Sequence, residues 1–313
     1  MISLKLHITN GDTTSKKLEE LNFEGKKITW REILCEGKTT TDVGSKNFWK
    51  NRFNFFKTYY RTSKQKFLNY TVKEYRALCN EKNQDEIVLW FDYDLLSQIN
   101  MIALVSWLKR HRKGCQISLV STEKINNKKS IELNTLSDNQ LRQHYINRSI
   151  LSQNDIEYAD YIWQLYCSDN PLQLENAVKL HTNSTFKHLN KALKNHLQRF
   201  PSLKNGLNLI ENSILKTINK NEFKNKNQLI NNLSINHKNY GFLNNQYFNK
   251  MKILHKLFTS LNPITLTKAG KGVLAQQTNY YGKIRTDFSY LGGAKKYSYL
   301  YVNSTDKLLK ITS

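Results

Sequence analysis

Acidic residues are scarce in the second half of this 313-residue chain. Only four Asp or Glu follow Glu175, against 22 Lys and Arg, so residues 176–313 carry a formal charge of +18 out of +23 in total. Residues 1–136 carry +9 and residues 137–175 carry −4. A composition rich in Asn, Lys and Ile explains some of the lysine, but it does not explain why acidic residues are so few. So concentrated a surplus indicates a partner with a phosphate backbone, and we expect nucleic acid to contact the C-terminal part.

Cysteine pairs and long apolar runs are also missing. The four cysteines stand far apart with no CxxC pair, which argues against a zinc site and a disulfide framework: Cys35, Cys79, Cys115 and Cys167. The longest apolar stretch, residues 99–108, is much shorter than the roughly 20 residues that span a bilayer. No signal peptide is evident at the N-terminus, and no helix combines a Lys-rich face with a clean apolar one. We therefore expect a cytoplasmic protein without a membrane partner.

Familiar catalytic motifs are absent as well. The chain has no GxGxxG, P-loop, HExxH, GxSxG or kinase-like set, which disfavours dehydrogenase, NTPase, zinc-protease and serine-hydrolase functions. It also has only three prolines, no Gly/Ser-rich linker and no repeat of solenoid length. The chain therefore shows no linker that would mark a domain boundary. Its organisation is inferred from hydrophobic periodicity instead.

The first third alternates strand and helix patterns. Strands are predicted at residues 4–8, 27–30, 87–91 and 116–120, with helices at 13–21, 46–60, 63–79 and 95–111. The run at 87–91 is apolar throughout, as expected of a strand buried on both faces. Residues 1–136 are therefore predicted to be an α/β Rossmann-like domain with a mainly parallel sheet.

The rest of the chain reads as mainly helical. Residues 137–200 form a predicted helical connector, with helices at 138–145, 153–167, 172–181 and 186–199. Residues 201–313 are predicted to be a basic, winged-helix-like α+β domain with helices at 207–218, 227–233 and 246–258, a strand at 263–267, a short helix at 268–275 and a terminal β-hairpin at 297–302 and 307–311.

Three polar clusters follow predicted strands of the first domain. Carboxyl ends of parallel strands meet at one sheet edge, where ligands bind in α/β folds, so we expect these clusters to converge. The ligand-binding candidates are His7, Asn10, Gly11, Asp12, Arg31, Glu32, Glu36, Asp92, Asp94 and Gln98.

These clusters leave the chemistry open. Their five carboxylates suit a divalent metal such as Mg²⁺, which would support hydrolysis of a phosphate-bearing substrate. Alternatively, Asp92 and Asp94 bind ribose hydroxyls. In that case Asn10 and Gly11 bring backbone N–H groups to a phosphate at the start of the following helix. The same residues also occur in ordinary tight turns and helix caps.

Aromatic and basic residues interleave near the C-terminus. The preferred nucleic-acid contacts lie in a predicted loop and in the segment after it: Tyr280, Tyr281, Lys283, Arg285, Lys295 and Lys296. Aromatic rings stack on unpaired bases while cations track the backbone, so this mixture is typical of nucleic-acid binding.

Six segments of the chain resemble the bacterial domain of unknown function 1835 family, over nearly its full length. They are LHITNGD, WREILCEG, VLWFDYDLLSQINMIALVSWL, HLQRFPSLKNGLNLIENSIL, ITLTKAGKGVLA and YLGGAKKYSY. The resemblance implies no particular activity, but it marks His7, Asn10, Asp12, Glu32, Glu36, Asp94 and Gln98 as motif positions. Lys38 replaces a family proline, and Asp92-Tyr93 replaces a Glu-His pair, so a mechanism that needs either residue of that pair is disfavoured.

Three hypotheses follow from the sequence. The first is a nucleic-acid-associated or regulatory protein with a nucleotide-like ligand in the sheet-end pocket. The second is a metal-dependent hydrolase of a phosphate-bearing substrate. The third is a non-catalytic interaction module whose charge reflects its composition alone.

Overall fold

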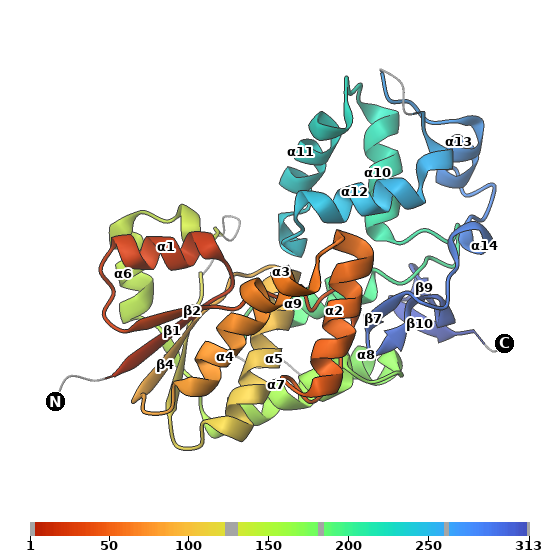
Figure 1. The fold of residues 1–313 in the computed structure, drawn as a ribbon. Coiled ribbons are helices and arrows are strands. Elements are labelled where there is room, and N and C mark those ends of the chain that lie inside the picture. Colours follow the sequence, from red (N-terminus) through yellow and green to blue (C-terminus); the bar gives the residue numbers. More distant parts are fainter. Residues whose placement is uncertain (1–3, 123–130, 181–184, 260–262, 312–313) are drawn as a thin grey trace.

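The computed structural model describes residues 4–122, 131–180, 185–259 and 263–311. A mainly parallel five-stranded sheet carries helices on both faces, and a group of helices stands apart from it (Figure 1). This agrees with the predicted α/β class. No helix in the described ranges is both long and apolar enough to cross a membrane.

The order of the strands sets the position of the crevice at their carboxyl ends. The sheet runs β2 (Lys26–Thr29), β1 (Lys5–Thr9), β4 (Glu86–Trp90), β5 (Gln116–Val120) and β6 (Ser149–Ile150), and only β6 is antiparallel. From β1 the chain moves outward to β2 and then returns to β4 on the other side of β1. The switch point of the sheet therefore lies between β1 and β4, where α/β folds bind ligands.

Helix α5 (Leu95–His111) is the buried centre of the domain. Every residue from Leu95 to Leu108 is buried, because the sheet covers one side and α7 (Gln153–Tyr166) and α9 (Leu189–Leu197) cover others. The opposite face of the sheet carries α1 (Asp12–Glu20) and α6 (Asp138–Ile146) (Figure 1). Leu18 of α1 and Leu141 of α6 pack with Trp90. Helix α8 (Pro171–Leu180) completes the predicted helical connector.

A π-helical turn interrupts one predicted helix. The segment 63–79 folds as α3 (Lys64–Phe67), a π-helix (Leu68–Val72) and α4 (Lys73–Asn80), after the long helix α2 (Lys46–Tyr60). The extra residue of a π turn changes the direction of the side chains around it, and such turns are frequent at functional sites.

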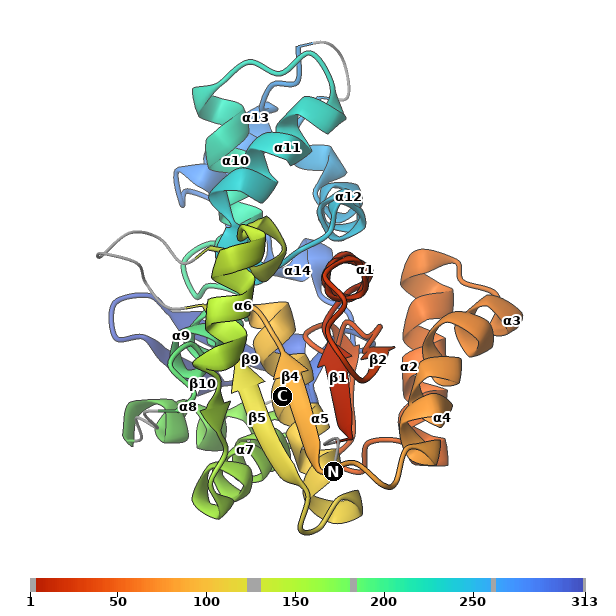
Figure 2. The same cartoon turned by 90° about the vertical axis from the view of Figure 1, so that its left-hand side faces the viewer.

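The C-terminal helices form a group over the carboxyl ends of the sheet strands (Figure 2). They are α10 (Leu209–Lys220), α11 (Lys226–Asn236), α12 (Asn244–Ile253), α13 (Lys268–Leu274) and α14 (Tyr281–Ile284), and residues 209–285 are called the helical segment below. The predicted strand at 263–267 is reduced to a single antiparallel bridge between Phe258 and Leu266 within the described residues. The predicted loop at 280–285 is the short helix α14.

Small β elements attach the end of the chain to its beginning. Strand β3 (Gly37–Lys38) pairs in parallel with β7 (Tyr290–Gly292), which pairs with β8 (Ala294–Lys295). A Cβ on Gly293 would lie 1.8 Å from the carbonyl oxygen of Cys167, so this segment packs closely on the connector. Strands β9 (Tyr299–Val302) and β10 (Lys307–Lys310) form the predicted terminal hairpin.

Candidate functional site

A cavity of about 620 Å³ lies at the carboxyl ends of β1 and β4, beneath the segment that joins α11 to α12. We call it the sheet-edge cavity. Seven of the ten ligand-binding candidates line it: Asn10, Gly11, Asp12, Arg31, Glu32, Asp92 and Asp94. The structure therefore brings the three polar clusters together, as the sheet topology required.

Asn10 fixes the turn between β1 and α1. Its Nδ2 donates to Ser97 Oγ at 2.8 Å, and its Oδ1 accepts from Asn100 Nδ2 at 2.7 Å. Asn100 also donates to the Glu32 carbonyl oxygen at 2.7 Å. One buried amide network on α5 thus holds the ends of β1 and β2 in register, which gives Asn10 a structural role at the cavity wall.

Asp12, Arg31 and Tyr70 form a second wall. Arg31 Nε donates to Asp12 Oδ1 at 2.8 Å, Tyr70 Oη donates to Asp12 Oδ2 at 2.6 Å, and the Tyr70 ring lies 4.5 Å from the guanidinium carbon. Partial burial opposes ionisation of Asp12, but the hydrogen bonds from Arg31 and Tyr70 prevail and lower its pKa. Asp12 is therefore ionised, and both of its oxygens already accept hydrogen bonds from Arg31 and Tyr70.

The floor of the cavity is acidic. Burial, followed by the nearby charges of Asp94 and Glu132, raises the pKa of Asp92 to about 7, although the Leu133 amide donates to Asp92 Oδ1 at 2.7 Å. Asp94 caps α5 by accepting from the Ser97 amide at 2.9 Å, and burial raises its pKa too. The raised pKa values of Asp92 and Asp94 favour their protonated forms, so this floor donates hydrogen bonds as well as accepting them.

The helical segment forms the roof. A Cβ on Gly241 would lie 2.0 Å from Asp94 Oδ1, so only glycine permits this approach, and its φ of +64° also favours glycine. His237, Lys238 and Phe242 line the same side of the cavity. The roof comes from residues far along the chain from the strands, so hydrophobic periodicity does not predict it.

Several side chains at the cavity have polar atoms without partners. Among the described residues, no hydrogen bond is made by four buried atoms of lining residues: Trp30 Nε1, Glu32 Oε1, Asn134 Oδ1 and His237 Nδ1. All four atoms are buried, so a ligand in the open cavity would not reach them without a rearrangement of the wall. Local sequence patterns did not mark Trp30, Tyr70, His237 or Glu132 as residues of a site.

Three predicted site residues lie outside this cavity. His7 is fully buried in the sheet, where its Nε2 lies 2.9 Å from the Glu24 carbonyl oxygen and its Nδ1 accepts from Trp90 Nε1 at 3.0 Å. Burial lowers the pKa of His7 to about 4, so it is a neutral core residue. Gln98 lies beneath the floor and donates to the Asp92 carbonyl oxygen at 2.7 Å, whereas Glu36 lines a different cavity.

Metal ligation finds no support in the described residues. No three His, Cys, Asp or Glu side chains in them come together in a way that could hold a metal ion. Asp12 is engaged by Arg31, and the buried Glu32 pairs with Arg52 at 2.9 Å. Of the five carboxylates that the sequence offered as a metal set, Asp12, Glu32 and Glu36 pair with cations, Asp94 caps α5, and Asp92 accepts from the Leu133 amide.

The nucleic-acid candidates are divided between surface and interior. Lys283, Arg285 and Lys295 are exposed, and Tyr280 and Tyr281 are partly exposed. Lys296 is buried and its Nζ lies 2.9 Å from Glu211 Oε1, so it is not available to a surface ligand. The prediction for Lys296 was therefore wrong, because Glu211, which pairs with it, lies far away in the chain.

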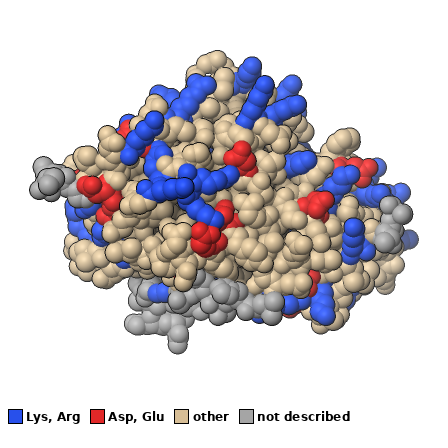
Figure 3. Space-filling model, turned by 90° about the horizontal axis from the view of Figure 1, so that it is seen from below, with Lys and Arg blue, Asp and Glu red and all other residues tan. Residues whose placement is uncertain are grey.

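The exposed cations concentrate on the helical segment. Between Asn212 and Thr286 the only acid is Glu222, whereas eleven exposed cations occur there: Lys216, Lys220, Lys224, Lys226, Lys238, Lys252, Lys256, Lys268, Lys271, Lys283 and Arg285. On the face seen in Figure 3, by contrast, Asp and Glu lie among the Lys and Arg. The helical segment thus carries many exposed cations with few acids among them.

Comparisons with known proteins leave the family open. No protein-family model and no curated protein matches this chain. Among solved structures, 53 chains are similar, including the crystal structure of the Plasmodium falciparum topoisomerase II DNA-binding, cleavage and re-ligation domain. That similarity has a TM-score of 0.45 at 12% identity, and it covers 82% of this chain but only 42% of that one. A similarity this low assigns neither a fold family nor a function.

Proposed function

We propose that this chain is a nucleic-acid-binding protein and that the helical segment supplies the binding surface. The observation that carries the proposal is the set of eleven exposed cations against one acid between Asn212 and Thr286. A surface of this kind attracts a phosphate backbone and releases its counterions on binding.

The arrangement of the helical segment supports this proposal. The predicted winged-helix-like part has three successive helices, α10, α11 and α12, followed by a single bridge between Phe258 and Leu266 and by helix α13, where a winged-helix module has a β-hairpin. In helix-turn-helix modules the recognition helix enters the major groove. Here α12 instead faces the N-terminal domain, since Lys250 pairs with Glu36 and Asn249 Nδ2 donates to the Tyr59 carbonyl oxygen at 3.2 Å. We therefore expect contacts with phosphates, without strong sequence preference.

The family resemblance and the cellular compartment are part of the same proposal. The resemblance to the domain of unknown function 1835 family would make this a shared property of that family. All four cysteines are free thiols, as expected in a reducing cytoplasm. Binding to duplex DNA or to RNA is compatible with phosphate contacts, and the experiment below distinguishes the two.

Fluorescence anisotropy with labelled duplex DNA and single-stranded RNA at several salt concentrations tests this proposal. Log affinity should fall linearly with log salt, with a slope of about −0.9 per phosphate engaged on DNA. Changing Lys216, Lys220, Lys224 and Lys226 together to Gln should weaken binding at least 10-fold and reduce the slope. The matched control changes Lys46, Lys50, Lys64 and Lys66, which are equally exposed on α2 and α3. Equal losses in both variants, or no binding at low salt, would refute the proposal.

A second candidate function is small-ligand binding in the sheet-edge cavity. We infer that the ligand is nucleoside-like, because the carboxyls of Asp92, Asp94 and Glu132 line the cavity and form hydrogen bonds with hydroxyl and amino groups of such a ligand. The volume of the cavity falls in the range of small-molecule sites.

Calorimetric titration with adenosine and cytidine tests the second candidate. Binding should weaken at least 5-fold in Glu132→Gln and remain unchanged in Glu20→Gln, an exposed acid of α1. Absence of heat with either nucleoside, or equal affinity in Glu132→Gln, would remove support for this ligand class.

A further inference from the structure

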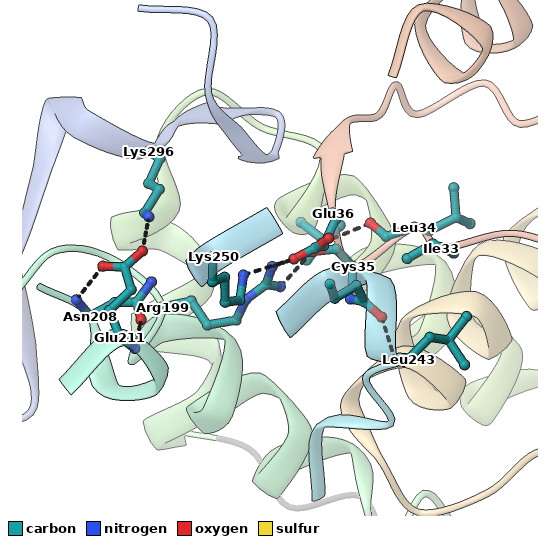
Figure 4. Close-up of polar contacts among 12 residues, drawn as sticks. Ile33, Leu34, Cys35, Glu36, Arg199, Asn208, Glu211, Leu243, Lys250 and Lys296 are labelled. Atoms are coloured by element: carbon teal, nitrogen blue, oxygen red, sulfur yellow. Dashed lines mark hydrogen bonds and ion pairs between the residues drawn. The ribbon is translucent and has the colours of Figure 1, made fainter. Parts of the chain in front are cut away.

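A second cavity, of about 420 Å³, lies between the N-terminal domain and the helical segment. Strand β3 and helix α2 form one side, α10 and α12 the other, and the segment leading into β7 closes it. Figure 4 shows its charged centre, to which Glu36, Arg199, Glu211, Lys250 and Lys296 contribute. We call it the inter-segment cavity.

The charges at its centre do not balance. Three cations, Arg199, Lys250 and Lys296, meet two carboxylates, Glu36 and Glu211, and the side chains of all five are at most 15% exposed. Glu36 Oε1 is shared, lying 3.3 Å from Arg199 Nη2 and 3.1 Å from Lys250 Nζ. A buried cation without its own carboxylate is unfavourable, and an anion would relieve the imbalance.

The two carboxylates are ionised at neutral pH, so their negative charges are already included in this balance. Burial opposes their ionisation, but Lys250 and Arg199 lower the pKa of Glu36, and Lys296 lowers the pKa of Glu211. The second oxygen of Glu211 accepts from the Asn208 amide at 2.9 Å. One positive charge therefore remains at the centre of the cavity.

Exposed apolar side chains surround its mouth. Among the lining residues, Tyr59 is 39% exposed, Ile253 43% and Phe288 85%. Phe288 is the most exposed of the large apolar side chains in the described residues, and it packs little against the protein. A ring held at the mouth of a cavity can stack on a flat ligand, which every nucleobase provides.

We propose that the inter-segment cavity binds a nucleoside monophosphate or a phosphorylated end of a nucleic-acid strand. The phosphate lies beside Lys250 and Arg199, and the base stacks on Phe288 and Tyr59 at the mouth. The shared chemistry is a phosphate attached to a nucleoside, and this site is separate from both sites proposed above.

Calorimetric titration of the full chain with AMP, inorganic phosphate and adenosine tests the proposal. AMP should bind at least 10-fold more tightly than inorganic phosphate. Lys250→Gln should weaken AMP binding at least 10-fold, and Phe288→Ala should weaken it about 5-fold while leaving phosphate binding unchanged. Lys50→Gln and Tyr161→Ala are the controls, since both side chains are exposed and neither lines the cavity.

The outcomes separate this site from the others. A 10-mer RNA with a 5′-phosphate is compared with the same RNA bearing a 5′-hydroxyl, which shows whether a strand end is bound. The proposal is supported if AMP binds more tightly than inorganic phosphate, or if the phosphorylated RNA binds more tightly than the unphosphorylated one. Unchanged AMP affinity in both Lys250→Gln and Phe288→Ala would overturn it. Because Phe288 is so exposed, its variant should fold and keep the test decisive. Adenosine binding lost in Glu132→Gln but retained in Lys250→Gln would identify the sheet-edge cavity instead.

Discussion

At the scale of single residues, the clearest departures from expectation involve buried charges. The sequence marked Glu32 and Glu36 as ligand candidates, but both meet cations that lie 20 or more positions away in the chain. His7 looked like a pocket residue, and its ring is fully paired inside the sheet. Residue type indicates what a side chain can bind, whereas its partner depends on the packing of distant segments.

Asp92 should make stability depend on pH. Its folded pKa of about 7 lies above the ordinary 3.8, so the folded state holds a proton that the unfolded state lacks between these values. The free energy of unfolding should therefore fall as pH rises from about 4 to 7, and stay low above that. Asp92→Asn should be about 1–2 kcal/mol more stable at pH 8, since the side chain is partly exposed, and about equal to the parent at pH 4.

Urea titrations of both proteins at pH 4, 6 and 8 measure this. Asp85→Asn is the control, because its carboxyl accepts a hydrogen bond from the Leu4 amide on the exposed surface. A difference that does not change with pH would show that Asp92 is ionised throughout.

The Arg52 and Glu32 pair should be strongly coupled. Arg52 is fully buried, its Nε and Nη2 lie 2.9 Å from Glu32 Oε2, and it donates to the carbonyl oxygens of Ile33 and Glu36. Arg52→Met would leave Glu32 buried without its cation, so we expect a loss of about 3–5 kcal/mol. The double variant Glu32→Gln/Arg52→Met should recover part of that loss in chemical denaturation. A double variant less stable than Arg52→Met would contradict this coupling.

At the scale of elements, long segments follow their local patterns closely. Helices α2 and α5 and strand β5 have the predicted bounds, and Ser45 and Asp94 cap the two helices through side-chain oxygens. The four two- and three-residue strands β3, β6, β7 and β8 were not predicted, because so few residues carry no periodicity. The π turn at Leu68–Val72 was also missed, and with it the position of Tyr70 beside Asp12.

Two glycines of α13 should respond in opposite ways to alanine. A Cβ on Gly270 would lie 1.9 Å from the Leu257 carbonyl oxygen, whereas at Gly272 the nearest atom is Thr278 Oγ1 at 3.3 Å. Alanine favours helices by about 1 kcal/mol over glycine, so Gly272→Ala should be neutral or stabilising by up to that amount. Gly270→Ala should destabilise by about 1–3 kcal/mol, because backbone must move. Thermal melts of the two variants compare them directly, and equal effects would contradict the close contact with Leu257.

At the scale of the whole molecule, the net charge of +23 should weaken the folded state at low salt. Mutual repulsion among cations is screened as ionic strength rises, since the Debye length falls to about 8 Å at 0.15 M. The Tm should rise by about 2–4 °C between 20 and 300 mM sodium chloride. The variant with Lys216, Lys220, Lys224 and Lys226 changed to Gln should show a smaller rise. A Tm that falls with salt would indicate that surface ion pairs dominate instead.

At this scale, direct contacts also hold the beginning of the chain to its end. The pairing of β3 with β7 joins residues 37–38 to residues 291–292, and Lys250 reaches Glu36 across 214 positions. Both proposed ligand cavities lie where early and late segments meet. A ligand in either cavity would thus contact both parts of the chain.

The sequence by itself determined the α/β class, the four parallel strands, the main helices and the basic surplus after Glu175. These features depend on local periodicity, capping and composition, which act between residues close in the chain. Only the tertiary structure decided which carboxylates meet cations, that the helical segment covers the sheet edge, and that Lys296 is buried against Glu211. Those contacts join residues separated by tens to hundreds of positions, so their energies depend on topology that no local pattern encodes.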